Sequence, residues 1–339
     1  MRPRGAAKAV ALALAAALIT AVVACSSGGK DSLIVYSGRS EDLVQPLIVQ
    51  FEEDTGINVQ VKYGETAEMA ATILEEGSNS PADVYYGQDA GALGYLDQEG
   101  RLAELPQELL DRVDPRFRAR DGRWVGLSGR ARVVAYNTEN VDPATLPSSI
   151  LDFTDEEWGG RIGWAPTNGS FQAFVTALWL IEGEDAAREW LEGIKANGAK
   201  DYPNNTAALE AAANGEVDVA FVNHYYLYPA LAERGDGFGA RNHYTGPGDA
   251  GSLVNVAGAG ILDSADNREN AERFLEYMLS GDAQQHFADA TFEYPLIEGI
   301  ETHPDLLPLS DLDPPDIDLS DIADLEGTLD LLRETGVLP

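Results

Sequence analysis

The chain has one cysteine, four histidines and few basic residues, and each shortage excludes a class of site. Cys25 alone cannot form an internal disulfide. His224, His243, His286 and His303 are scattered and lack the spacing of a zinc site. With 23 Lys and Arg against 57 Asp and Glu, the formal charge is −34, which repels nucleic acid and anionic lipid. No P-loop, HExxH or GxSxG motif points to a common hydrolase.

The N-terminus reads as a processing signal rather than as part of the fold. Three basic residues precede an apolar run over residues 9–21, which is too short for a membrane span of about 20 residues. Small residues lead into Cys25, and a Ser- and Gly-rich spacer follows it, as in a bacterial lipobox. We expect a signal peptide over residues 1–24, lipid attachment at Cys25 and a linker over 25–31. The alternative is an ordinary cleaved signal with a coincidental cysteine.

The chain after the signal alternates between strand and helix patterns. Residues 33–36, 57–63 and 82–86 read as strands, and residues 41–54 and 66–76 read as amphipathic helices ending at Gly56 and Gly77. Later helices are expected over 171–181, 185–197, 206–214 and 267–279. This order predicts an α/β fold with a largely parallel sheet.

Two extended segments, near residues 131–137 and 252–261, bracket the middle of the chain. We therefore expect the chain to cross to a second lobe and return, forming a two-segment hinge beside an interlobe cleft. The N-terminal lobe would take residues 32–133 and 255–304, and the C-terminal lobe residues 134–254. Residues 305–339 form an acidic segment, for which we expect a loop and a docked final helix with Leu325, Leu329 and Leu332 at helical spacing.

Two adjacent tyrosines, Tyr225 and Tyr226, follow a short apolar strand predicted over residues 217–222. Two phenols facing one cleft form a hard anionic oxygen site once they lose their protons. Because a free tyrosine titrates near pH ~10, a strong cation must hold the phenolates, and ferric ion suits oxygen donors. The alternative is that one tyrosine packs in the core and the other covers the strand end. His224 would point away from Tyr225 on a strand, so we interpret it as structural.

A second polar group surrounds the expected start of the helix at residues 171–181. Asn168, Gly169 and Ser170 form a small turn whose free backbone N–H groups and helix dipole favour an anion. Asn205 and Asn223 could donate amides to the same anion. The alternative for all of these residues is ordinary capping of helices and turns.

Several ordered segments together resemble those of the ferric-ion-binding periplasmic proteins, also called bacterial transferrins, which are substrate-binding components of iron ABC importers. The resemblance covers nearly the whole chain after the signal. It is carried by residues 35–38, 80–86, 127–134, 158–163, 166–169, 223–226 and 293–296.

The resemblance implies a two-lobed periplasmic-binding-protein fold, each lobe with a central sheet flanked by helices. It implies ferric iron on Tyr225 and Tyr226. It also implies a synergistic anion (carbonate, phosphate or citrate) on the helix start and on the asparagine amides described above.

The chain departs from the family where the other lobe usually adds a His and a Glu. Ser40 and Gln88 stand at these positions, and both are poor ligands for ferric iron. Asp89 could substitute, or a chelating anion held by Arg39 could fill the free positions. We therefore expect iron to be taken as an anion-chelated complex, or to be held more weakly than in relatives with all ligands.

The expected role is that of a monomeric, extracytoplasmic lipoprotein, anchored to the cell membrane through lipid only. It would deliver iron to an ABC permease with its ATPase and would not be an enzyme. One rival keeps the transport role for a non-metal solute such as a small organic anion, with aromatic side chains lining the pocket. A second rival is an extracellular hydrolase. A third, a purely structural surface protein, leaves the two-lobe pattern unexplained.

Overall fold

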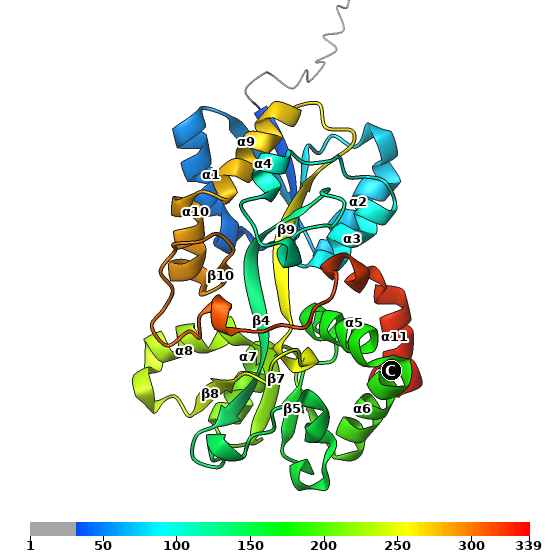
Figure 1. Ribbon diagram of the computed structural model, residues 1–339, viewed down its shortest axis with the longest axis vertical. Helices are drawn as coiled ribbons and strands as arrows, with labels where there is room; N and C mark the ends of the chain where they lie inside the picture. Colours follow the sequence, from blue (N-terminus) through cyan, green and yellow to red (C-terminus); the bar gives the residue numbers. More distant parts are fainter. Residues whose placement is uncertain (1–31) are drawn as a thin grey trace, which may run out of the picture.

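The computed structural model describes residues 32–339 (Figure 1). The signal peptide, Cys25 and the whole linker lie outside the described residues, so the lipid-attachment prediction stays a prediction. Within the described part of the chain, no helix is both long and apolar enough to cross a membrane.

The N-terminal lobe begins as alternating strands and helices. Strand β1 pairs in parallel with both β2 and β3. Helix α1 ends at Gly56, whose φ of 72° lies in the left-handed region that favours glycine. The predicted α/β pattern is thus present. The elements are β1 (Ser32–Ser37), α1 (Glu41–Thr55), β2 (Asn58–Tyr63), α2 (Thr66–Glu76), β3 (Val84–Gly87), α3 (Ala90–Gln98) and α4 (Gln107–Leu110).

Strand β4 (Val125–Asn137) carries the chain from one lobe to the other. Its residues up to Ala131 pair antiparallel with β9 (Val254–Ile261), whereas from Arg132 onward it pairs with β7 and β8 of the C-terminal lobe. Figure 1 shows β4 and β9 running along the long axis between the upper and lower groups of helices. The sheet order β2-β1-β3-β9-β4-β7-β5-β6 places both strands at its centre. All pairings of β4 and β9 are antiparallel and only the two ends of the sheet are parallel, so the prediction of a largely parallel sheet is wrong.

The C-terminal lobe packs helices on both faces of its part of the sheet. Successive residues of β7 enter different clusters: Phe221 packs with Trp190 of α6, whereas Val222 packs with Leu209 of α7. The elements are β5 (Ile162–Trp164), α5 (Gly169–Glu182), α6 (Glu184–Ala196), β6 (Lys200–Asp201), α7 (Asn205–Ala213), β7 (Val219–Asn223), α8 (Leu227–Arg234) and β8 (Ala240–His243).

One local premise in this lobe is wrong. The tyrosine pair follows the strand as predicted, but His224 is not on a strand, because pairing of β7 with β4 ends at Asn223 opposite Arg132. The next three residues, His224–Tyr226, form a single 3₁₀ turn that leads into α8. Strand alternation therefore does not decide where these three side chains point.

After β9 the chain returns to the N-terminal lobe and adds α9 (Arg268–Met278), α10 (Gly281–His286) and β10 (Tyr294–Pro295). A π-helical turn over Phe287–Thr291 links α10 to β10. Strand β10 pairs with Ser128 and Gly129 of β4, which fixes the 287–295 segment to this lobe.

The final segment contacts both lobes. A 3₁₀ turn at Leu319–Ala323 packs on α3, and α11 (Leu325–Glu334) packs on α5. The hydroxyls of Thr176 on α5 and Thr328 on α11 form a buried hydrogen bond of 2.7 Å. The buried face of α11 is Thr328, Leu331 and Leu332; Leu325 is exposed, which corrects the predicted docking face.

Gly94→Ala is expected to lower the free energy of unfolding by about 1–3 kcal/mol, as overpacking does. A Cβ at Gly94 would lie 2.4 Å from the backbone oxygen of Ser320, so the final segment must move off α3. Urea unfolding measures the loss. Gly281→Ala is the control, because a Cβ there meets nothing within 4 Å. Equal stability of the two variants would show that the segment does not need this contact.

Candidate functional site

The tyrosine pair lies directly after the end of β7, in the 3₁₀ turn that leads into α8. The rings of Tyr225 and Tyr226 stack, with centroids 4.4 Å apart and planes 29° apart. Both residues are half-buried. Burial raises the pKa of Tyr225 well above 10, the neighbouring Tyr226 raises it further, and the Arg130 guanidinium opposes the shift. Tyr225 therefore stays protonated near neutral pH unless positive charge is added.

Three buried arginines surround this pair. Arg39 follows β1, and Arg130 and Arg132 lie on β4; their exposed fractions are 2, 2 and 4%. The one buried carboxylate in this group is Glu293, so two of the three guanidinium charges lack an internal counter-charge. Buried cations without partners are costly. Such a group is typical of a site that receives negative charge.

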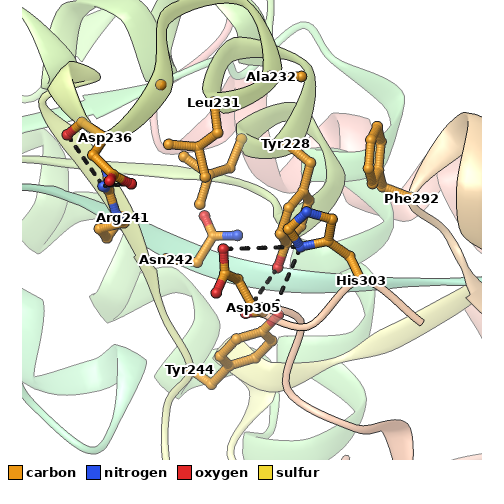
Figure 2. A pocket seen from close by; sticks show the side chains of 12 residues that line it. Tyr228, Leu231, Ala232, Asp236, Arg241, Asn242, Tyr244, Phe292, His303 and Asp305 are labelled. Atoms are coloured by element: carbon orange, nitrogen blue, oxygen red, sulfur yellow. Dashed lines mark hydrogen bonds and ion pairs between the residues drawn. The ribbon is translucent and has the colours of Figure 1, made fainter. Parts of the chain in front are cut away.

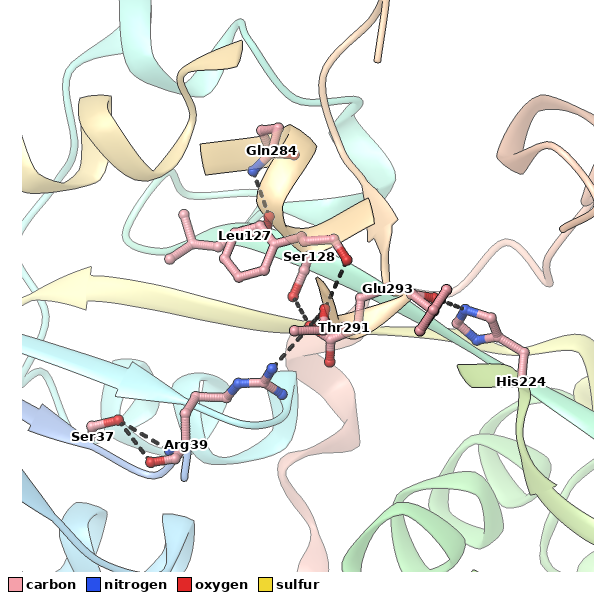
Figure 3. A network of polar contacts seen from close by, with 10 residues as sticks. Ser37, Arg39, Leu127, Ser128, His224, Gln284, Thr291 and Glu293 are labelled. Atoms are coloured by element: carbon pink, nitrogen blue, oxygen red, sulfur yellow. Dashed lines mark hydrogen bonds and ion pairs between the residues drawn. The ribbon is translucent and has the colours of Figure 1, made fainter. Parts of the chain in front are cut away.

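Arg39 is committed to an internal network (Figure 3). Its Nη2 donates to Glu293 Oε2 at 2.9 Å, and the same oxygen accepts from Ser128 Oγ at 2.8 Å and from Thr291 Oγ1 at 3.3 Å. Burial is the largest single effect and lowers the pKa of Arg39, but the carboxylate of Glu293 together with Tyr86 and Tyr225 outweighs it, so the pKa is raised. This ion pair uses one nitrogen of the guanidinium, and among the described residues the buried Nε of Arg39 has no hydrogen-bond partner, so its role in holding an external anion stays a prediction.

Arg130 has no partner of this kind. Within residues 32–339, no hydrogen bond or ion pair reaches its guanidinium, and its buried Nε is unsatisfied. Its charge nevertheless acts on Tyr225 and on the fully buried Tyr86. Arg130 is therefore the cation best placed to gain from a negative charge arriving at the tyrosine pair.

The side chain of Arg132, on β4, contacts two residues of the C-terminal lobe. Its Nη1 donates to Asn223 Oδ1 at 3.0 Å, and its guanidinium lies over the ring of Phe174 on α5 at 5.6 Å. Burial lowers the pKa of Arg132 to about 10, although the charges of Tyr226 and Tyr225 act in the opposite direction. Phenolates at these tyrosines would thus stabilise the protonated arginine.

The start of α5 brings together three of the residues predicted to bind an anion. Asn168 is the N-cap, and its Oδ1 accepts from Ser170 N at 3.1 Å. Asn205, fully buried, donates to both Asn168 Oδ1 and Ser170 Oγ at 3.2 Å, while its own Oδ1 has no partner. Gly169 is exposed, and a Cβ there would meet nothing within 4 Å. Asn223 lies apart from this cluster, bonded to Arg132.

The predicted residues of the other lobe lie at the ends of β1 and β3. Ser40 is exposed at the N-cap of α1 and makes no side-chain cap bond. The backbone N–H of Gln88 donates to Thr66 Oγ1 at 3.2 Å. Asp89 Oδ1 accepts from Ala92 N at 3.0 Å and caps α3, so the same carboxylate already has a structural role.

Phenol oxygens are the donors that this arrangement offers to a metal. Among the described residues, no group of three or more His, Cys, Asp or Glu side chains could hold a metal ion. The pocket of about 520 Å³ in Figure 2 is lined by Tyr228, Tyr244, Phe292 and His303, among others, and by none of the predicted site residues.

Sequence reasoning gave no role to Arg130, Arg132 or Glu293. Two arginines two residues apart in an otherwise apolar strand share one face, which is a signal that could have been used. Glu293 could not be matched to Arg39 from local pattern, because 254 residues separate them.

Comparison with known proteins places the chain among bacterial transport proteins. The family model described as bacterial extracellular solute-binding protein matches residues 79–315. The chain is 33% identical over 326 residues to the major ferric iron-binding protein of Neisseria meningitidis serogroup B, covering 95% of this chain and 98% of the relative. It is 34% identical to iron uptake protein A2 of Synechocystis, covering 86% of each.

Solved structures show the same fold. Iron-bound HitA from Pseudomonas aeruginosa is 37% identical with a TM-score of 0.83, over 90% of this chain and 99% of that one. Trichodesmium FutA in complex with iron and citrate is 29% identical with a TM-score of 0.81, over the same shares. The two-lobed fold and the resemblance found in the sequence are thus confirmed. The chain belongs to the family of bacterial extracellular solute-binding proteins that includes the ferric-ion-binding periplasmic proteins.

Proposed function

We propose that this protein binds ferric iron between the phenolates of Tyr225 and Tyr226 and carries it to a membrane permease. The observation that carries the proposal is the stacked tyrosine pair beside two buried guanidinium charges without a counter-charge. Two phenolates supply the negative charge that this region lacks, and a trivalent cation supplies the attraction needed to remove their protons.

The relatives support the choice of metal. The names of the Neisseria and Synechocystis proteins refer to iron binding or uptake, and one solved neighbour holds iron. The similarity spans nearly the whole chain, so both tyrosines lie within the matched region. Iron is the cargo of such a protein.

A synergistic anion completes the proposed site. The N-terminus of α5, with Gly169 exposed and Asn168, Ser170 and Asn205 clustered, offers backbone and hydroxyl donors. Arg130 offers a charge with no other partner. A neighbour of known structure holds iron together with citrate. Carbonate, phosphate or citrate would each suit this donor set. Asn223, which is bonded to Arg132 and not to this cluster, would add an amide only if the anion reaches it.

Ser40 and Gln88 are poor replacements for the His and the Glu that the family usually supplies from the other lobe. Two phenolates leave most positions of an octahedral ion free, so the anion supplies further oxygens as a chelate, or Asp89 leaves its capping position to add one. Iron would then be bound as an anion complex.

Transport requires the two lobes to close on the cargo, with better binding to the closed form than to the open one. We propose that residues 32–133 and 255–304 form one lobe and residues 134–254 the other, with 305–339 spanning both. A monomer anchored through lipid at Cys25 would meet an ABC permease and its ATPase at the cell surface, without enzyme activity of its own. A single lipid chain anchors marginally, so more than one is needed.

A visible-absorption titration tests the proposal. The protein without its signal is titrated with ferric citrate and with ferric ion alone. Colour from tyrosinate-to-iron charge transfer, saturating near one iron per protein, is expected, and its dependence on citrate identifies the missing ligands. The buried positive charge would equally suit a small organic anion. Absence of colour under both conditions, with citrate binding in calorimetry, would establish that alternative.

A further inference from the structure

The side chain of His224, which belongs to the C-terminal lobe, is held by two backbone groups of the N-terminal lobe, one of them at the point where β4 crosses between the lobes. It is fully buried on the 3₁₀ turn of the C-terminal lobe, directly before Tyr225. Its Nδ1 is 3.0 Å from the backbone N of Ala131, and its Nε2 is 2.8 Å from the backbone oxygen of Phe292. Figure 3 shows the ring reaching toward the segment that carries Thr291 and Glu293.

One tautomer satisfies both bonds. The N–H of Ala131 can only donate, so Nδ1 must accept and carry no proton; the oxygen of Phe292 can only accept, so Nε2 must donate. The ring is therefore a neutral imidazole protonated at Nε2, and it bridges two backbone groups by one hydrogen bond at each nitrogen. The ring also stacks on Tyr294 of β10, with centroids 4.6 Å apart.

The two backbone partners lie where relative movement of the lobes would be felt: one at the crossing of β4 between the lobes, the other next to β10. Ala131 is the last residue of β4 that pairs with β9, and Arg132 is the first that pairs with β7, so the bond to Nδ1 sits where the strand passes between lobes. Phe292 belongs to the N-terminal lobe, because Glu293 bonds Arg39 and β10 pairs with β4.

Phe292 is held in an unusual conformation that presents its carbonyl to His224. Its φ of 55° makes it the one non-glycine residue among residues 32–339 in the left-handed region. Such a conformation persists only where the surrounding structure enforces it. Stacking of Phe292 on Tyr228 of α8, visible in Figure 2, adds a second contact between the lobes here.

We propose that His224 is a positioning residue that couples lobe movement to the tyrosine pair, with its Nε2–H···Phe292 bond slowing the release of iron. The inference rests on the proposed function. When the lobes separate, Phe292 moves relative to the 3₁₀ turn, so this bond must break or the turn carrying Tyr225 must move with it. Loss of the bond should speed release without removing a metal ligand.

Two substitutions separate the two bonds. His224→Asn keeps an acceptor near the Nδ1 position for Ala131 and loses the donor to Phe292. His224→Gln keeps a donor near the Nε2 position and loses the acceptor for Ala131. Each leaves one buried backbone group without a partner, so a purely structural role predicts similar loss of stability and similar kinetics for both.

The experiment loads each variant and the unaltered protein with ferric citrate and follows loss of colour in excess EDTA. We expect His224→Asn to release iron about tenfold faster, and His224→Gln to stay within about threefold of the unaltered protein. Equal rates in the two variants, or rates that follow only their unfolding midpoints, would overturn the inference. Absence of colour in the unaltered protein would instead overturn the proposed function.

A second variant covers the case in which His224→Asn does not fold. Phe292→Gly keeps the carbonyl partner but frees the backbone and removes the stack on Tyr228. Faster release with unchanged iron stoichiometry is the expected result, and an unchanged rate would contradict the proposal.

Discussion

Replacing both Tyr225 and Tyr226 with phenylalanine is expected to abolish ferric binding and its colour. Each substitution removes one oxygen donor while keeping the ring and its stacking, so the fold should persist. Loss of even an outer partner of a metal ligand typically costs about 10–100-fold in affinity, so each single variant should lose more than about 100-fold. Visible absorption and equilibrium dialysis against ferric citrate measure both effects.

Tyr95→Phe is the matched control for this experiment, because Tyr95 is an exposed tyrosine on α3. It should bind iron like the unaltered protein. Full iron affinity and colour in the double variant would show that the two tyrosines do not bind iron. Loss of binding in Tyr95→Phe as well would indicate general damage to the protein.

Arg130→Met is expected to act in opposite directions on the iron-free and the loaded protein. The guanidinium is buried with no hydrogen-bond partner, so an apolar side chain of similar length should raise the free energy of unfolding of the iron-free protein by about 1–3 kcal/mol. The same change removes a positive charge that favours the Tyr225 phenolate. Affinity for iron in the presence of citrate should fall by about 10–100-fold.

Arg132→Met supplies the contrast. Its guanidinium donates to Asn223 Oδ1, so its removal leaves a buried acceptor unsatisfied and should destabilise the iron-free protein. Urea unfolding and citrate-dependent titration of the two variants give the comparison. A destabilised Arg130→Met protein that binds iron normally would show that Arg130 has a structural role and no part in the site.

Local periodicity was enough to predict the framework of the fold. The helix predicted over residues 41–54 is observed at Glu41–Thr55, and the extended segment near residues 131–137 forms the part of β4 that pairs with the C-terminal lobe. Both features follow from side-chain spacing and from glycine at helix ends, which act over a few residues.

The errors arise where distant segments decide the outcome. The 3₁₀ turn at His224–Tyr226 exists because β7 loses its partner at Asn223, which depends on where β4 ends its pairing. The ion pair of Arg39 with Glu293 was also not predicted, because 254 residues separate the two side chains. The docking face of α11 centres on Thr328 because Thr176 of α5 offers a hydroxyl. None of these partners can be inferred from neighbouring residues.

Part of the candidate site could be predicted from the sequence. The turn at Asn168 was predicted from its small polar residues at a helix start, and Asn205 as a further amide donor. The structure brings the two within hydrogen-bond distance at the start of α5. The arginines beside the tyrosines were missed, because the same strand pattern also occurs with arginines at a solvated edge. Their roles in anion and metal binding remain predictions for the experiments above.

The most direct test of the central claim is a crystal structure of the protein loaded with ferric citrate, with anomalous diffraction recorded at the iron edge. The account predicts one anomalous peak within bonding distance of the hydroxyl oxygens of both Tyr225 and Tyr226, with the anion between it and the start of α5. An anomalous peak away from both tyrosines, or citrate bound there without iron, would contradict it.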